Sequence, residues 1–197
     1  MGRSKRGFTL LELLAVITAL SILMGIVLPA IGKVKRSVAA QQCKIQYQRY
    51  VQALVANYNE YGQFPSWLSI NTPVNISGNL DKFCASLTGK ENDGLTLISD
   101  DELKAYNPYL IEFLELSDVD FNVINNTNSL RDKICNAFNQ HDIFIVISDG
   151  DMFIPKSAFN AYESIKKKIP DTGLRERVAI FSVGDNKRSI DVVSWNE

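Results

Sequence analysis

Polar and apolar positions divide the N-terminal part of the chain into two segments. Residues 1–7 contain three basic residues and no acid, whereas residues 8–31 contain one charged side chain, Glu12, in 24 positions. An α-helix needs about 20 apolar residues to cross a bilayer, and no other segment of this chain offers them. Residues 8–31 are therefore predicted to form a membrane-spanning helix.

Beyond residue 32 the apolar positions follow one face of a second helical segment. Over residues 47–61 they recur at spacings of three and four, the period of one α-helical face. An aromatic stripe with this period is typical of a helix that packs on the core of a domain. We therefore expect residues 33–61 to be a helix packed on a sheet. The buried stripe is predicted to be Tyr47, Val51, Leu54, Tyr58 and Tyr61, and the exposed face Gln46, Arg49, Gln52, Asn59 and Glu60.

Proline and glycine mark the expected bend and end of this long helix. Pro29 lacks a backbone donor and clashes with the preceding turn, so a kink is predicted near residues 25–29. Gly62 is expected as the C′ residue, and Pro65 prevents the helix from resuming. Residues 8–61 would span about 80 Å at 1.5 Å per residue, far more than a bilayer. The second half of the helix must therefore belong to a soluble head.

The C-terminal region predicts a small antiparallel sheet, residues 142–197, preceded by a loop and helix insert, residues 66–141. Asp149-Gly150 is a hairpin signal between two β-rich runs. Ser99 to Glu102 fits a capping box before a helix. The predicted fold class is α+β, with a long kinked N-terminal helix against this sheet. The expected strands are residues 143–147, 152–154, 178–183 and 190–195, and the expected helices include residues 80–87, 109–116 and 129–138, with residues 71–79 as a loop and 158–168 as a helix or loop.

Composition narrows the classes of function. The 197 residues carry 21 basic and 22 acidic side chains, a net charge of −1, which does not favour a nucleic-acid partner. A single histidine, His141, argues against a histidine-based triad or a multi-histidine metal site. We find no catalytic constellation and predict that the protein is not an enzyme.

Glu12 is the residue that a plain membrane anchor does not explain. An acid near the middle of a membrane costs roughly 2.5–3.5 kcal/mol on insertion scales, so such residues are usually functional and partnered. The residues around it, Gly7-Phe8-Thr9-Leu10-Leu11-Glu12, resemble the cleavage and methylation motif of type IV prepilins and type II secretion pseudopilins.

This resemblance implies specific roles for three residues. A prepilin peptidase/N-methyltransferase would cut after Gly7 and methylate the new N-terminus at Phe8. Glu12, fifth in the mature chain, would pair with the Phe8 amine of a neighbouring subunit during assembly. At about 4 Å and an effective dielectric near 20, such a pair gains on the order of 4 kcal/mol, enough to offset burial of the acid.

The resemblance also implies a domain organisation and a location. Residues 1–7 would be a leader, residues 8–32 the transmembrane and filament-core helix, residues 33–65 its amphipathic second half, and residues 66–197 the head of a pilin fold. The basic N-terminal flank places that terminus in the cytoplasm by the positive-inside rule. The expected protein is a single-pass inner-membrane protein with a periplasmic head, whose mature form enters a periplasmic filament.

Near its C-terminus the chain resembles major pseudopilins. In that family the block matching residues 181–195 forms a loop that binds calcium, which implies Asp185 and Asp191 as ligands together with backbone carbonyls. Lys187 and Arg188 lie within this loop and oppose a cation, so a hairpin turn with solvated charges remains the alternative. Residues 58–65 also resemble the end of the long helix in major pseudopilins.

Three cysteines leave the redox state open. An exported compartment is oxidising, so a Cys84–Cys135 disulfide is one alternative and buried free thiols are the other. Cys43 lies on the long helix.

The predicted function is that of a structural subunit of a type II secretion pseudopilus. Its partners would be further copies of the chain, other pseudopilins, inner-membrane secretion components and the processing enzyme. One alternative is a type IV pilin for adhesion, motility or DNA uptake; pilins often close a C-terminal loop with a disulfide, and no cysteine follows Cys135. A second alternative is a periplasmic enzyme or binding module with a pilin-like anchor.

Overall fold

The computed structural model describes residues 10–92, 95–117, 120–121, 133–150, 152–184 and 191–195. The chain divides into two compact units, Met1–Val38 and Ala39–Glu197. One helix, α1 (Leu10–Tyr61), runs through the boundary between them. The second unit adds a four-stranded antiparallel sheet and short helices, so the fold class is α+β, as predicted.

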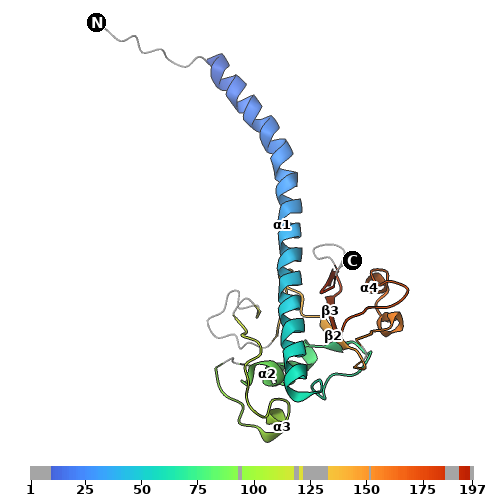
Figure 1. Cartoon of the computed structure of the whole chain (residues 1–197). Coiled ribbons are helices and arrows are strands. Elements are labelled where there is room, and N and C mark those ends of the chain that lie inside the picture. Colours follow the sequence, from blue (N-terminus) through green and yellow to red (C-terminus); the bar gives the residue numbers. More distant parts are fainter. Residues whose placement is uncertain are drawn as a thin grey trace. The chain divides into compact units, whose positions relative to one another are not determined.

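Helix α1 is more regular than its sequence suggests. Its helical assignment continues without interruption from Leu10 to Tyr61, across the region where a kink was expected. The ribbon of the first unit bends instead of breaking (Figure 1). The predicted end is confirmed: Gly62 has φ +72° and its N–H donates to the carbonyl of Tyr58 at 2.8 Å.

The sheet of the second unit has the order β1-β2-β3-β4, and every pair in it is antiparallel. Strand β2 pairs with β3 over its whole length, with Ile145 opposite Ile180. The hairpin predicted between the last two strands is present, because Phe181 lies opposite Val193. The strands are β1 (Val74–Asn75), β2 (Ile143–Ile147), β3 (Val178–Ser182) and β4 (Val192–Val193).

Both faces of this sheet are covered, because alternate residues of each strand point to opposite sides. On one face Ile143, Ile145 and Ile180 join a core with Tyr47 and Leu54 of α1. The other face packs a second core against η2 (Lys156–Phe159) and α4 (Glu163–Lys166). That second core contains Val146, Ile154, Phe159, Ile165, Ile169, Leu174, Ala179, Phe181, Val193 and Trp195.

Two expectations for the sheet were wrong. Residues 152–154 do not return along β2: Ile154 bridges to Leu174, while β2 is occupied on both sides by β1 and β3. Strand β1 was expected to be loop, because its two residues carry no pattern of their own. It pairs through long-range contacts, with Val74 opposite Ile145.

Helix α2 (Leu80–Thr88) confirms the prediction for residues 80–87. Helix α3 (Asp101–Lys104) is capped by Asp100 instead of Ser99, because the Asp100 carboxylate accepts the N–H groups of Glu102 and Leu103. Residues 109–116 and the described residues 133–138 are not helical. Residues 129–132 of the third expected helix lie outside the described residues.

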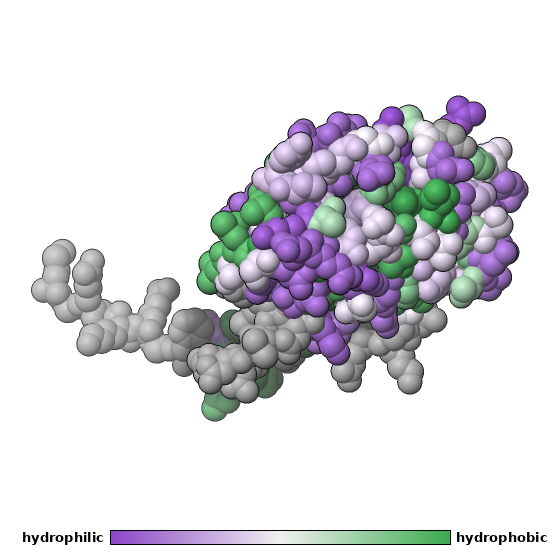
Figure 2. All heavy atoms as spheres, turned by 90° about the horizontal axis from the view of Figure 1, so that it is seen from below, coloured by the Kyte–Doolittle hydropathy of each residue, from purple (hydrophilic) through white to green (hydrophobic). Residues whose placement is uncertain are grey.

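Exposed apolar residues are concentrated in α1. Over the described residues 10–38 of the first unit every large apolar side chain is largely exposed. The face of the second unit seen in Figure 2 mixes hydrophilic and hydrophobic residues. The apolar segment of α1 therefore has the surface of a helix that needs a lipid or protein environment.

Candidate functional site

The processing motif lies at the start of α1. Gly7 and Phe8, the predicted cleavage residues, are outside the described residues. Glu12 lies in the first turn of α1 and is exposed. An acid in this turn interacts favourably with the positive end of the helix dipole.

Hydroxyl groups in the apolar segment form hydrogen bonds with the backbone of the same helix. The Thr18 hydroxyl donates to the carbonyls of Leu14 and Ala15 at 3.0 and 2.9 Å, and the Ser21 hydroxyl donates to that of Ile17 at 2.7 Å. Polar groups inside a bilayer need such partners, because the hydrocarbon offers none. The length and composition of α1 allow it to cross a membrane. None of the most apolar stretch of this helix is buried in the structure.

The charges on the two flanks of this segment do not set its orientation. The N-terminal flank carries three basic residues, and the C-terminal flank also carries three, Lys33, Lys35 and Arg36. The positive-inside rule depends on a difference between the flanks. The flanking charges alone therefore favour neither orientation, and a cytoplasmic N-terminus stays a prediction from the cleavage motif.

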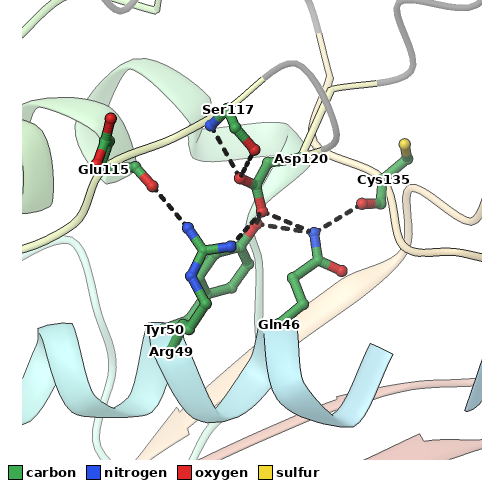
Figure 3. Close-up of polar contacts among 7 residues, drawn as sticks. All are labelled: Gln46, Arg49, Tyr50, Glu115, Ser117, Asp120 and Cys135. Atoms are coloured by element: carbon green, nitrogen blue, oxygen red, sulfur yellow. Dashed lines mark hydrogen bonds and ion pairs between the residues drawn. The ribbon is translucent and has the colours of Figure 1, made fainter. Parts of the chain in front are cut away.

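A buried acid, Asp120, organises the polar contacts of the head (Figure 3). Its Oδ1 accepts hydrogen bonds from the Tyr50 hydroxyl at 2.9 Å and from the Gln46 amide at 3.2 Å. Its Oδ2 accepts the backbone N–H and the hydroxyl of Ser117 at 3.0 and 3.1 Å. The guanidinium of Arg49, 41% exposed, lies 3.5 Å from Oδ1. The carboxylate, 2% exposed, is thus fully paired.

The same contacts tie α1 to two segments far along the chain. Gln46 also donates to the carbonyl of Cys135 at 2.9 Å, and Arg49 donates to that of Glu115 at 2.6 Å. The N–H of Cys135 in turn donates to the carbonyl of Asp120 at 2.9 Å. The cluster of Gln46, Arg49, Tyr50, Ser117 and Asp120, the Asp120 cluster below, therefore anchors the insert on the helix.

The sequence did not reveal this cluster. Gln46 was expected on the exposed face of the helix, but it is 9% exposed. Tyr50 was left out of the buried stripe, but it is fully buried, and burial with the nearby Asp120 carboxylate raises its pKa well above the usual value. The available signal was the i, i+4 spacing of Gln46 and Tyr50, which places both beside Tyr47 on one side of the helix.

The predicted calcium site is only partly within the described residues. Asp185, Lys187 and Arg188 lie outside them. Oδ1 of Asp191 accepts the N–H of Gly184 at 2.8 Å, which fixes the base of the loop. Among the described residues there is no group of three His, Cys, Asp or Glu side chains placed to hold a metal. The residues described thus provide one carboxylate and do not by themselves make a calcium site.

The three cysteines are all described, and none forms a disulfide. Each thiol is buried in the second unit. Burial raises the pKa of the Cys43 thiol and raises that of Cys135 to about 11. A buried thiol with a raised pKa reacts slowly, which for Cys43 and Cys135 is typical of structural cysteines. His141 is half-buried, and its Nδ1 lies 3.4 Å from the carbonyl of Ile134.

Comparison with known proteins identifies the N-terminal segment. Residues 2–28 match the family model of the prokaryotic N-terminal methylation motif. No curated protein and no solved structure matches the chain. The motif supports a type IV pilin-like protein, processed by a prepilin peptidase. Together with the apolar helix, it fits a single-pass anchor in the inner membrane.

Proposed function

We propose that the chain is a structural subunit of a periplasmic pseudopilus of a type II protein secretion system, assembled after leader cleavage and N-methylation. One observation carries the proposal: the methylation motif leads directly into an apolar helix that continues, as α1, into the core of an α+β head. Such a chain has the parts that a filament subunit needs, and we propose a structural role instead of a catalytic one.

The C-terminal hairpin supports secretion over a pilus. Strands β3 and β4 and Trp195 correspond to the block that resembles the major pseudopilins, and Trp195 is buried against Phe159. The proposed partners are further copies of this chain, other pseudopilins and inner-membrane secretion components. A type IV pilin for adhesion, motility or DNA uptake is the second candidate, since the methylation motif fits it equally well.

Intact-mass analysis tests the processing step. The full-length chain is expressed with and without a prepilin peptidase and extracted from membranes. With the enzyme, we expect loss of residues 1–7 and the gain of one methyl group on Phe8. A Gly7→Val variant is the matched control, because a branched side chain at the cleavage position should block the cut. A retained leader, or a cut beyond residue 31, would contradict the proposal.

A deletion strain separates the two filament types. Loss of the gene should leave secreted proteins in the periplasm while surface pili remain, and the wild-type gene should restore secretion. The Gly7→Val variant should be membrane-bound and fail to restore it. If the deletion instead removed surface filaments and left secretion intact, the chain would be a type IV pilin.

Calcium binding by Asp185 and Asp191 is a separate proposal, based on the resemblance of the C-terminal block. Calcium prefers six to eight oxygen ligands, which two carboxylates and backbone carbonyls would supply. Titration of the detergent-solubilised full chain with calcium should raise its melting temperature, with magnesium as the control ion, and Asp191→Asn should remove the effect. An unchanged melting temperature and no heat of binding would exclude the site.

A further inference from the structure

Charge is distributed unevenly between two segments of the second unit. Residues 80–117 carry eight acidic and three basic side chains, a net charge of −5, whereas residues 152–184 carry three acidic and six basic side chains, a net charge of +3. The first segment contains α2 and α3, and the second contains η2, α4 and β3. The composition of the whole chain conceals this difference, because the total is only −1.

The sheet separates the helices of these two segments. Leu87 of α2 joins the core that contains Ile145 of β2, and α3 lies against α2. Ile165 of α4 belongs to the core on the other face of the sheet. Figure 1 shows the same arrangement, with α2 and α3 on one side of β2 and β3 and α4 on the other. The head therefore has an acidic face on the side of α2 and α3, residues 80–117, and a basic face on the side of α4, residues 152–184.

Ion pairs inside each face leave its net charge in place, because a pair cancels one charge of either sign. On the acidic face, Nζ of Lys104 lies 3.5 Å from Oδ1 of Asp101, whose side chain is 99% exposed. The next residue, Glu102, is exposed as well. On the basic face, Lys167 and Arg175 are exposed. Charged side chains of each face are therefore accessible to a second molecule.

Opposite charges on opposite sides of the head favour one way of joining two copies. Two acidic faces, or two basic faces, repel each other when they meet, whereas an acidic face attracts a basic one. A contact between different faces of identical chains is heterologous, and it generates an open helical filament when its rotation does not close a ring. The partner that fits both faces is a second copy of this chain, because each copy carries both complementary surfaces.

We propose that the acidic face of one subunit docks on the basic face of the next, with Asp101 and Glu102 of one copy close to Lys167 and Arg175 of its neighbour. This contact rests on the filament assembly contained in the proposed function, and it adds the two surfaces that join neighbouring heads. Exposed ion pairs are individually weak in water. The two faces therefore set the direction in which subunits join more than the strength of the filament.

Charge reversal with rescue tests the proposal. The association constant of the full chain is measured by sedimentation equilibrium at low salt, in an uncharged detergent that shields the apolar segment. An exposed ion pair is worth up to about fivefold in such a constant. We expect D101K/E102K and K167E/R175E each to weaken association several-fold. The combined variant D101K/E102K/K167E/R175E exchanges the signs of the two faces, so it should associate as the wild type does. Added salt should weaken association of the wild type.

The matched control reverses two exposed acids outside both faces. E60K/D149K changes the total charge as much as D101K/E102K does, and it should leave association unchanged. Melting temperatures of all variants show whether the head is folded. A monomeric wild type, unchanged association in the two reversed variants, or no rescue in the combined variant would overturn the proposal. Because detergent solutions need no filament, rescue in a chain whose deletion affects neither secretion nor pili would support the contact and contradict the proposed function.

Discussion

Asp120 lies at the centre of the polar contacts between α1 and the head. Its replacement therefore tests most directly how the head is held on α1. Asp120→Ala leaves the Tyr50 hydroxyl without its carboxylate acceptor, while the Gln46 amide keeps the carbonyl of Cys135. A buried unsatisfied group costs about 1–3 kcal/mol, so we expect the free energy of unfolding to fall by about 2 kcal/mol.

Chemical denaturation of the full chain in detergent, followed by tryptophan fluorescence, measures this loss, since Trp67 and Trp195 are both in the head. Asp120→Asn keeps one acceptor and should lose less. Asp171→Ala removes a fully exposed carboxylate that pairs with Lys156, and it should change little. Equal stabilities for Asp120→Ala and the wild type would show that the Asp120 cluster does not stabilise the head.

Buried, protonated thiol and phenol groups make the stability of the head sensitive to alkaline pH. Burial raises the pKa of the Cys135 thiol from 9.0 to about 11, and that of Tyr50 also rises. The unfolded chain therefore loses these protons at lower pH than the folded chain. Stability is fully present below pH 9 and should fall as pH rises from about 9 through 11. Melting temperatures across this range check the trend, and Cys135→Ala should flatten it; a flat wild-type profile would contradict it.

Local sequence patterns predicted those helices and strands that local interactions stabilise. Helix α1, α2, β2 and β3 follow from hydrophobic periodicity and β-propensity in their own residues. The helix predicted over residues 109–116 does not form because its backbone N–H groups have other partners. The side-chain oxygen of Asn107 accepts the N–H of Ile111, and the N–H groups of Phe113 and Leu114 donate to the carbonyl of Leu87. Such long-range partners leave no periodic signal in the sequence.

The end of α2 depends on a glycine that faces this irregular segment. Gly89 has φ +68°, and a Cβ built on it would lie 2.8 Å from the carbonyl oxygen of Leu110. We expect Gly89→Ala to lower the free energy of unfolding by about 2 kcal/mol, through the left-handed backbone and the close contact. Gly78→Ala is the control, since nothing lies within 4 Å of its Cβ position. Thermal denaturation of both variants checks the difference; equal melting temperatures would contradict it.

In the whole molecule, the processing motif could be predicted from the sequence and the Asp120 cluster could not. The processing motif is a contiguous run, so Gly7, Phe8 and Glu12 were accessible to sequence reasoning and the motif match covers them. The Asp120 cluster joins residues 46–50 to residues 117–120, and no local pattern links them. Loss of the leader would leave 18 basic and 22 acidic residues, so the mature chain is more acidic than its precursor.

The role proposed for Glu12 opposes membrane insertion of the chain and favours its assembly. A carboxyl group in a membrane helix costs roughly 2.5–3.5 kcal/mol, whereas a pair with the Phe8 amine of a neighbouring subunit gains on the order of 4 kcal/mol. We propose that through this pair the acid disfavours the isolated inserted chain and favours the assembled one. We predict that Glu12→Leu increases the fraction of chain that resists carbonate extraction and abolishes filaments in sheared or pelleted fractions.

Glu12→Gln separates charge from size in the same assay. Glutamine has nearly the shape of glutamate but does not form an ion pair with an amine, so assembly should fail in this variant as it does in Glu12→Leu. Intact mass establishes first that the leader has been removed in both variants, so that a processing defect is not mistaken for an assembly defect. Filaments of normal yield from processed Glu12→Leu would refute the assembly role, and normal yield from Glu12→Gln alone would show that a hydrogen bond suffices without the charge.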